Sequence, residues 1–235
     1  MQNQIFAAID TQDPALAAGL TAALTGVVSG VKIGLEFFNA NGPDGVRRIA
    51  NTGVPFFLDL KFHDIPNTVA GAIRAAVSLK PAILNVHASG GAAMMKAAAT
   101  AITESADALG VVKPMLIAVT VLTSLDDDDL AAVGQRGVSE EQVVRLAKLT
   151  EDCGLDGVVC SPLEIRAIRA ACNSEFKLVV PGIRPAGTEA GDQKRTMTPA
   201  DAINAGADYL IIGRPITAAD DPAKAARTIA ATITP

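Results

Sequence analysis

The segment FLDLKFHDIPNT (57–68) brings acidic and basic side chains together at the end of an apolar run. Residues two apart in a strand point to the same face, so we expect Asp59 and Lys61 to project together and Asp64 to follow in the loop. Lys32, in the preceding apolar run, adds a second ammonium group. A buried ion-pair network that only ties strand ends together is the alternative, but desolvation makes such networks weak stabilising devices.

Fixed charges of alternating sign suit a reaction in which negative charge develops on carbon. A carboxylate beside a substrate carboxylate raises the energy of the bound substrate. A nearby ammonium group stabilises the carbanion that remains when CO2 leaves, and it can then donate a proton to that carbon. The residue types therefore favour a decarboxylation.

A second group of residues has the character of a phosphate site. The Gly-rich segment PGIRPAGTEAGDQKR (181–195) contains Arg184 and Gln193, and Gly213 and Arg214 follow the last apolar run. In β/α barrels the loops after the seventh and eighth strands frequently bind phosphate, and a guanidinium group can hold phosphate with two hydrogen bonds. The alternative is a surface loop with solvated cations.

Eight short apolar runs, separated by amphipathic stretches of helical periodicity, must position these side chains. The runs are 5–10, 30–35, 56–61, 83–88, 115–122, 157–161, 177–183 and 209–214. Continuously apolar strands alternating with helices indicate a parallel sheet covered on both faces. We predict one domain over 1–235, a (β/α)8 TIM barrel with its active site at the carboxyl ends of the strands; an open doubly wound sheet is the lesser alternative. Asp10 closes the first predicted strand, Thr123 follows the fifth, and both join the candidate site.

Composition excludes several other classes. The net charge of −5 argues against general binding to nucleic acid or to an acidic membrane surface. The first ten residues lack a secretory signal, and no apolar run is long enough to span a bilayer, so we expect a cytoplasmic protein. Cys153, Cys160 and Cys172 are too scattered for a disulfide framework or a CxxC metal site. The two histidines, His63 and His87, do not make a metal site without further ligands.

The motifs resemble those of a known family. FLDLKFHDIPNT looks like the signature of the orotidine 5'-phosphate decarboxylase family, and further motifs are similar to its bacterial members in matching order: NVHASGG, IAVTVLTS, CGLDGVVCS, PGIRP, EAGDQKR and IIGRP. The resemblance covers nearly the whole chain. It implies conversion of orotidine 5'-phosphate to UMP and CO2 in de novo pyrimidine biosynthesis, without metal or organic cofactor.

The resemblance also implies roles for the charged residues. Lys61 matches the lysine that protonates C6 of the pyrimidine, and Asp59 matches the aspartate set against the substrate carboxylate. Lys32 and Asp64 complete the charged network. In this family the active site lies at a dimer interface, and the matches of Asp64 and Thr68 reach into the neighbour's site. A homodimer is therefore implied.

Further matches concern substrate binding. Asp10 and Lys32 would contact the ribose hydroxyls, Thr123 the pyrimidine edge, and Gln193 both base and phosphate. The phosphate end would be formed by Arg184, Gly213 and Arg214.

Two rival interpretations remain open. A related barrel, such as a 3-keto-gulonate 6-phosphate decarboxylase or hexulose phosphate synthase, shares the D-x-K-x-x-D strand end but uses magnesium; the DIPNT segment and the GDQ loop argue against it. A catalytically silent nucleotide-binding barrel is the second rival. The intact set of Lys32, Asp59, Lys61 and Asp64 argues against that, since binding alone has no use for a carboxylate facing an anionic substrate.

Overall fold

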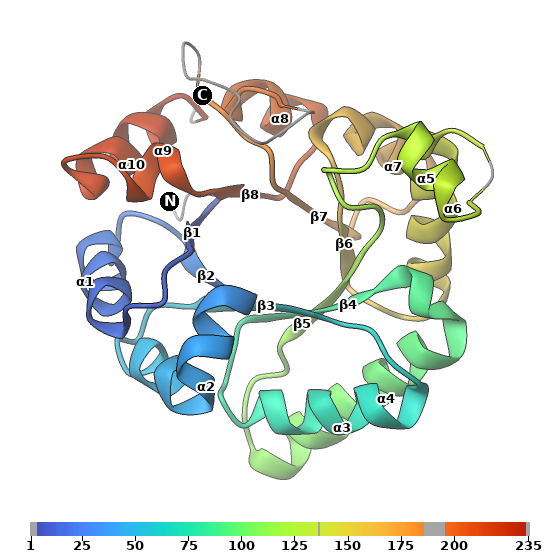
Figure 1. Ribbon diagram of the computed structural model, residues 1–235, viewed down its shortest axis with the longest axis horizontal. Helices are drawn as coiled ribbons and strands as arrows, with labels where there is room; N and C mark the ends of the chain where they lie inside the picture. The colour runs from blue at the N-terminus through green and yellow to red at the C-terminus, as the bar shows by residue number, and fades with distance from the viewer. Residues whose placement is uncertain (1–3, 136, 186–195, 234–235) are drawn as a thin grey trace.

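A computed structural model describes residues 4–135, 137–185 and 196–233 (Figure 1). Its strands form a closed parallel barrel in sequence order, with β8 pairing back to β1. The strands are β1 (Ile5–Ile9), β2 (Gly30–Gly34), β3 (Phe56–Phe62), β4 (Ile83–His87), β5 (Met115–Val119), β6 (Gly157–Val159), β7 (Lys177–Val180) and β8 (Tyr209–Ile212). The predicted barrel is confirmed, and the open sheet is wrong.

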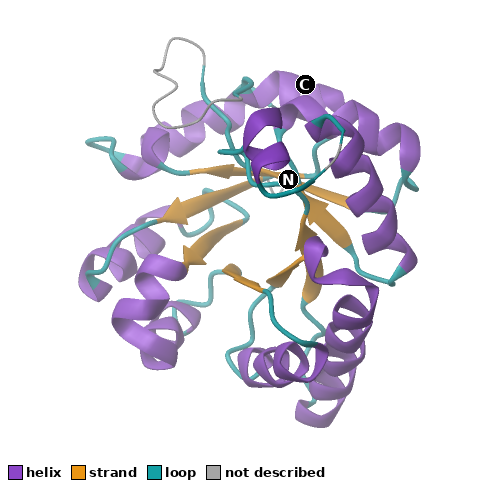
Figure 2. Ribbon diagram, turned by 45° about the vertical axis from the view of Figure 1, so that its right-hand side comes forward, coloured by secondary structure: helices purple, strands orange, loops and turns teal. Residues whose placement is uncertain are grey.

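Helices surround the barrel on its outer side (Figures 1 and 2). They are α1 (Pro14–Leu24), α2 (Leu35–Ala50), α3 (Pro66–Val77), α4 (Gly91–Leu109), α5 (Asp127–Ala132), α6 (Ser139–Asp152), α7 (Ile165–Ala171), α8 (Pro199–Ala205), α9 (Arg214–Thr217) and α10 (Pro222–Ala231), with 3-10 turns η1 (Ala88–Gly90) and η2 (Pro162–Glu164). Within the described ranges, no helix is both long and apolar enough to cross a membrane.

All eight strands begin at the predicted residues, because a continuous apolar run is a clear signal of a doubly covered strand. All but β3 end one to three residues before the apolar run does. After β5 and β7 the chain leaves the ladder and turns over the barrel opening. The apolar residues beyond these strand ends, Val121, Leu122, Pro181 and Gly182, line a cavity instead of extending the sheet.

Two apolar layers hold the barrel. The larger layer lies between strands and helices, and a smaller cluster fills the barrel interior. The interior cluster consists of Phe6, Ala8, Phe57, Ile83, Ile117, Val179 and Ile211. Phe57 is only 1% exposed, and burying one such side chain contributes about 1.5–3 kcal/mol. The interior is therefore packed, and the cavity above it has an apolar floor.

Candidate active site

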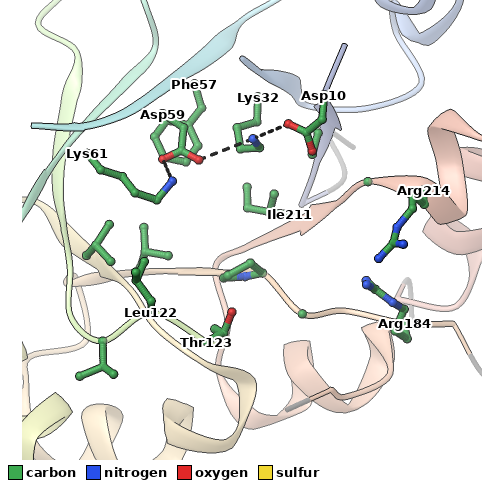
Figure 3. A pocket seen from close by; sticks show the side chains of 17 residues that line it. Asp10, Lys32, Phe57, Asp59, Lys61, Leu122, Thr123, Arg184, Ile211 and Arg214 are labelled. Atoms are coloured by element: carbon green, nitrogen blue, oxygen red, sulfur yellow. Dashed lines mark hydrogen bonds and ion pairs between the residues drawn. The ribbon is translucent and has the colours of Figure 1, made fainter. Parts of the chain in front are cut away.

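A cavity of about 280 Å³ lies at the carboxyl ends of the strands (Figure 3). Its charged and polar lining unites residues from six different strands or the loops that follow them. Those residues are Asp10, Lys32, Asp59, Lys61, Thr123, Arg184 and Arg214, and Gly213 joins them. Apolar residues of the floor and of the two overhanging loops complete the wall. The size and the mixed lining suit a small polar ligand.

Four of these side chains form a continuous chain of opposite charges (Figure 3). Lys32 Nζ lies 3.0 Å from Asp10 Oδ1 and 3.6 Å from Asp59 Oδ2. Lys61 Nζ lies 2.7 Å from the other oxygen of Asp59, Oδ1. The Lys32 and Asp59 side chains are almost buried, with 12% and 11% of their surface exposed, whereas Lys61 keeps 28%. Asp59 is therefore held between two ammonium groups in the lining of the cavity.

The charge state of Asp59 follows from these contacts. Burial alone would raise its pKa, but the Lys32 and Lys61 ammonium groups, with hydrogen bonds from Lys61 and Asn85, outweigh burial and lower the pKa below its ordinary value. Asp59 is consequently ionised at neutral pH. A substrate carboxylate placed beside it would meet a fixed negative charge, while both ammonium groups stay within reach of developing charge.

The backbone at Lys61 departs from a regular strand. Lys61 has φ = 51°, in the left-handed region that side chains other than glycine rarely adopt. The ladder between β3 and β4 also shifts, from Leu58 opposite Leu84 to Phe62 opposite Val86. Lys61 and Asp59 do project together, as predicted, but the irregular backbone brings their charged groups into contact, and simple alternation along a strand does not describe it.

Asn85, on β4, is the site residue that the sequence analysis missed. It is fully buried. Its Nδ2 donates to Asp59 Oδ1 at 2.7 Å, and its Oδ1 accepts from the Lys61 backbone N–H at 2.8 Å. The available signal was a lone amide in the otherwise apolar run ILNV, at a position that faces the barrel interior beside Ile117 of β5.

The opposite end of the cavity carries two guanidinium groups (Figure 3). Arg184 follows β7, and its Nη1 donates to the Ile183 carbonyl at 2.9 Å. Arg214 is the first residue of α9, directly after Gly213, which caps that helix. Both side chains extend toward the same region, away from Lys61. Two cations at one end of a small cavity favour an anion there.

Asp64 and Thr68 do not line this cavity. Both are exposed, at the start of α3, and Asp64 accepts a hydrogen bond from the Ile65 backbone N–H at 2.7 Å. Gln193 lies outside the described residues. The cavity of one chain thus brings together eight of the predicted residues, and Asp64 and Thr68 lie outside its lining.

The two histidines lie side by side near Lys61, with ring centroids 5.5 Å apart. Burial is the main cause that lowers the pKa of His87, and His63 and Lys61 lower it further while Asp59 opposes them. His87 is therefore neutral at pH 7 and adds no charge to the site. Across the described ranges there is no group of three or more His, Cys, Asp or Glu side chains arranged to hold a metal ion.

Comparison with known proteins places this geometry in a family. Residues 3–229 match the model of the orotidine 5'-phosphate decarboxylase / HUMPS family. The chain belongs to this family. Relatives named orotidine 5'-phosphate decarboxylase include one from Paramagnetospirillum magneticum, 55% identical over 98% of both chains. Another, from Rhodospirillum rubrum, is 57% identical over 99% of this chain and 94% of the relative.

A solved structure of the orotidine 5'-phosphate decarboxylase / HUMPS family gives the same fold. The orotidine 5'-phosphate decarboxylase from Lactobacillus acidophilus superposes with a TM-score of 0.88 and 36% identity, covering all of both chains. The resemblance inferred from the motifs is confirmed at the level of family and fold.

Proposed function

We propose that this chain decarboxylates orotidine 5'-phosphate to UMP and CO2, a step of de novo pyrimidine biosynthesis. The observation that carries the proposal is the ionised, buried Asp59 between Lys32 and Lys61, facing a cavity whose far end holds two arginines. Its high identity to relatives named for this activity supports the same substrate. A nucleoside monophosphate whose pyrimidine base carries a carboxylate has negative charge at both ends, and this matches a cavity with charged residues at both ends.

Substrate binding follows from the two ends of the cavity. The phosphate dianion sits on Arg184 and Arg214, near the backbone of Gly213, with charge-assisted hydrogen bonds. The ribose hydroxyls contact Asp10 and Lys32, and Thr123 contacts the pyrimidine edge. Gln193 bridges base and phosphate. These contacts orient the C6 carboxylate toward Asp59.

The chemical step needs only protein side chains. The bond from C6 to the carboxylate breaks, CO2 leaves, and the electron pair stays on C6. The Lys61 ammonium stabilises that carbanion and donates one proton to it, and the resulting amine regains a proton from water. Repulsion between Asp59 and the substrate carboxylate is relieved as CO2 leaves. No metal or organic cofactor takes part in the proposed step.

We also propose a homodimer in which Asp64 and Thr68 complete the partner's site. Their exposure just after β3, the strand that carries Asp59 and Lys61, supports this, as does the 67% exposed Ile65 beside them, an apolar side chain that a second chain would cover. The cysteines are all free thiols, which supports a reducing compartment such as the cytoplasm.

The test is a turnover assay with purified protein. Orotidine 5'-phosphate absorbance should fall on adding the protein, and the rate should be unchanged by EDTA. Loss of activity in EDTA, restored by Mg²⁺, together with turnover of 3-keto-gulonate 6-phosphate, would favour the magnesium-dependent phosphosugar activity instead. Binding of UMP without turnover of either substrate would indicate the silent nucleotide-binding barrel.

A further inference from the structure

The ladder between β3 and β4 is interrupted where the charged chain lies. Leu58 pairs with Leu84, and the next pair is Phe62 with Val86, so β3 advances four residues while β4 advances two. Asp59, Leu60 and Lys61 therefore pass opposite a single β4 residue, Asn85. Backbone polar groups in such an interruption need other partners, because a buried N–H without an acceptor is costly.

Asn85 supplies those partners with its side chain. Its carbonyl oxygen accepts from the Lys61 N–H at 2.8 Å, where β4 offers no backbone partner, and this fixes the left-handed Lys61. Its amide group donates to Asp59 Oδ1 at 2.7 Å, the same oxygen that meets Lys61 Nζ. One amide thus holds the backbone of the proposed proton donor and the side chain of its acidic partner.

We propose that Asn85 is a positioning residue for the reaction: it sets the geometry of the Asp59–Lys61 pair without touching substrate. Asn85 is fully buried and is not part of the cavity wall, so it acts only through its two partners. Both functions of the amide are needed at once. A donor alone would leave the Lys61 N–H unsatisfied, and an acceptor alone would repel Asp59. This inference rests on the proposed decarboxylation.

Two substitutions test these hydrogen bonds: Asn85→Leu removes both, and Asn85→Asp keeps the acceptor for the Lys61 N–H. Asn85→Leu keeps the branching and the number of side-chain heavy atoms and removes both hydrogen bonds. We expect kcat to fall about 100-fold, as for a reactive group displaced by about 1 Å, while the Kd for UMP stays within about threefold. The control Thr150→Val removes a buried hydrogen bond of α6 away from the cavity. It should lower thermal stability and leave kcat unchanged.

Asn85→Asp keeps the acceptor for Lys61 but can donate to Asp59 only when its carboxyl is protonated. Two carboxylates at this distance cannot both ionise easily, so the pKa of the pair is raised. The other ionisable neighbours are Lys32, Lys61, His63 and His87, whereas β5 presents Ile117 and Val119. We therefore divide the kcat of Asn85→Asp by the kcat of the unchanged protein at each pH, because ionisation of groups that both proteins share affects both values alike. We expect the ratio to be highest at low pH and to fall as pH rises.

The outcomes are distinct. If Asn85→Leu does not fold, Asn85→Asp, which keeps the shape of the side chain, decides alone through its pH-dependent ratio. A kcat near normal for a folded Asn85 variant would overturn this inference, and so would an Asn85→Asp ratio that is constant with pH. In either case, turnover by the unchanged protein would still support the proposed function. Absence of turnover by the unchanged protein would overturn both.

Discussion

Asp59 and Lys61 are two residues apart in the chain, and their charged groups meet at 2.7 Å across a left-handed backbone position. The pair is asymmetric: Asp59 is buried and held by Lys32 and Asn85 as well, whereas Lys61 faces the cavity with part of its surface exposed. The carboxylate is thus the fixed member, and the ammonium group is the member that a ligand can engage.

Replacing Lys61 tests the proton donor. Lys61→Ala should remove nearly all turnover, because the remaining ammonium group beside Asp59, that of Lys32, is also paired with Asp10. UMP binding should be largely kept. Lys113→Ala is a matched control, since Lys113 is an exposed lysine that also pairs with an aspartate, Asp156. Steady-state kinetics with both variants decides; Lys61→Ala within tenfold of normal activity would show that the assignment is wrong.

The lowered pKa of Asp59 predicts how stability depends on pH. The ordinary pKa of an aspartate carboxyl is near 3.8, and the pKa of Asp59 in the folded protein lies below it. Ionised Asp59 therefore stabilises the fold at pH values above the ordinary pKa. The contribution is lost as pH falls through the folded-state pKa. We therefore expect the free energy of unfolding of the unchanged protein, relative to Asp59→Asn, to decline below about pH 4. Urea unfolding from pH 7 to pH 3 measures this, and a difference that grows on acidification would contradict it.

Arg214 tests the phosphate end. Arg214→Ala should lower kcat/KM for orotidine 5'-phosphate about 30- to 150-fold, the equivalent of roughly 2–3 kcal/mol for lost charge-assisted hydrogen bonds. A substrate truncated at its phosphate should be turned over equally by both proteins, and phosphite dianion should activate that reaction only when Arg214 is present. Arg227→Ala, an exposed arginine of α10, is the control. An equal loss on the truncated substrate would place Arg214 outside the phosphate site.

The proposed composite site predicts complementation between chains. Asp64→Asn and Lys61→Ala would each inactivate a homodimer, but a heterodimer would contain one site with both defects and one intact site. After subunit exchange a statistical mixture should recover about a quarter of normal activity. Native mass spectrometry confirms the exchange. Proven heterodimers that stay inactive would show that Asp64 and Lys61 serve the same site from one chain.

The sequence predicted the positions of the strands because buried parallel strands are continuously apolar, as in IFAAI and YLII. It predicted the charged residues because they interrupt that pattern within the strands or directly after them. The left-handed Lys61 was not predictable, since nothing in the residue type indicates it. Asn85 was missed for a related reason: the role of a polar residue inside a strand can be recognised only when the hydrogen-bond ladder beside it is known to be interrupted.

The packed interior of the barrel also sets a direction for protons. Phe57 and Ile211 form part of the cavity floor and belong to the apolar cluster below it, so these two side chains offer no group that could relay a proton along the barrel axis. In the proposed reaction, Lys61 would regain its proton from solvent at the open mouth of the cavity, where part of its side chain is exposed. Product departure and the reprotonation of Lys61 would then use the same opening, so that product must leave before the proposed donor is restored.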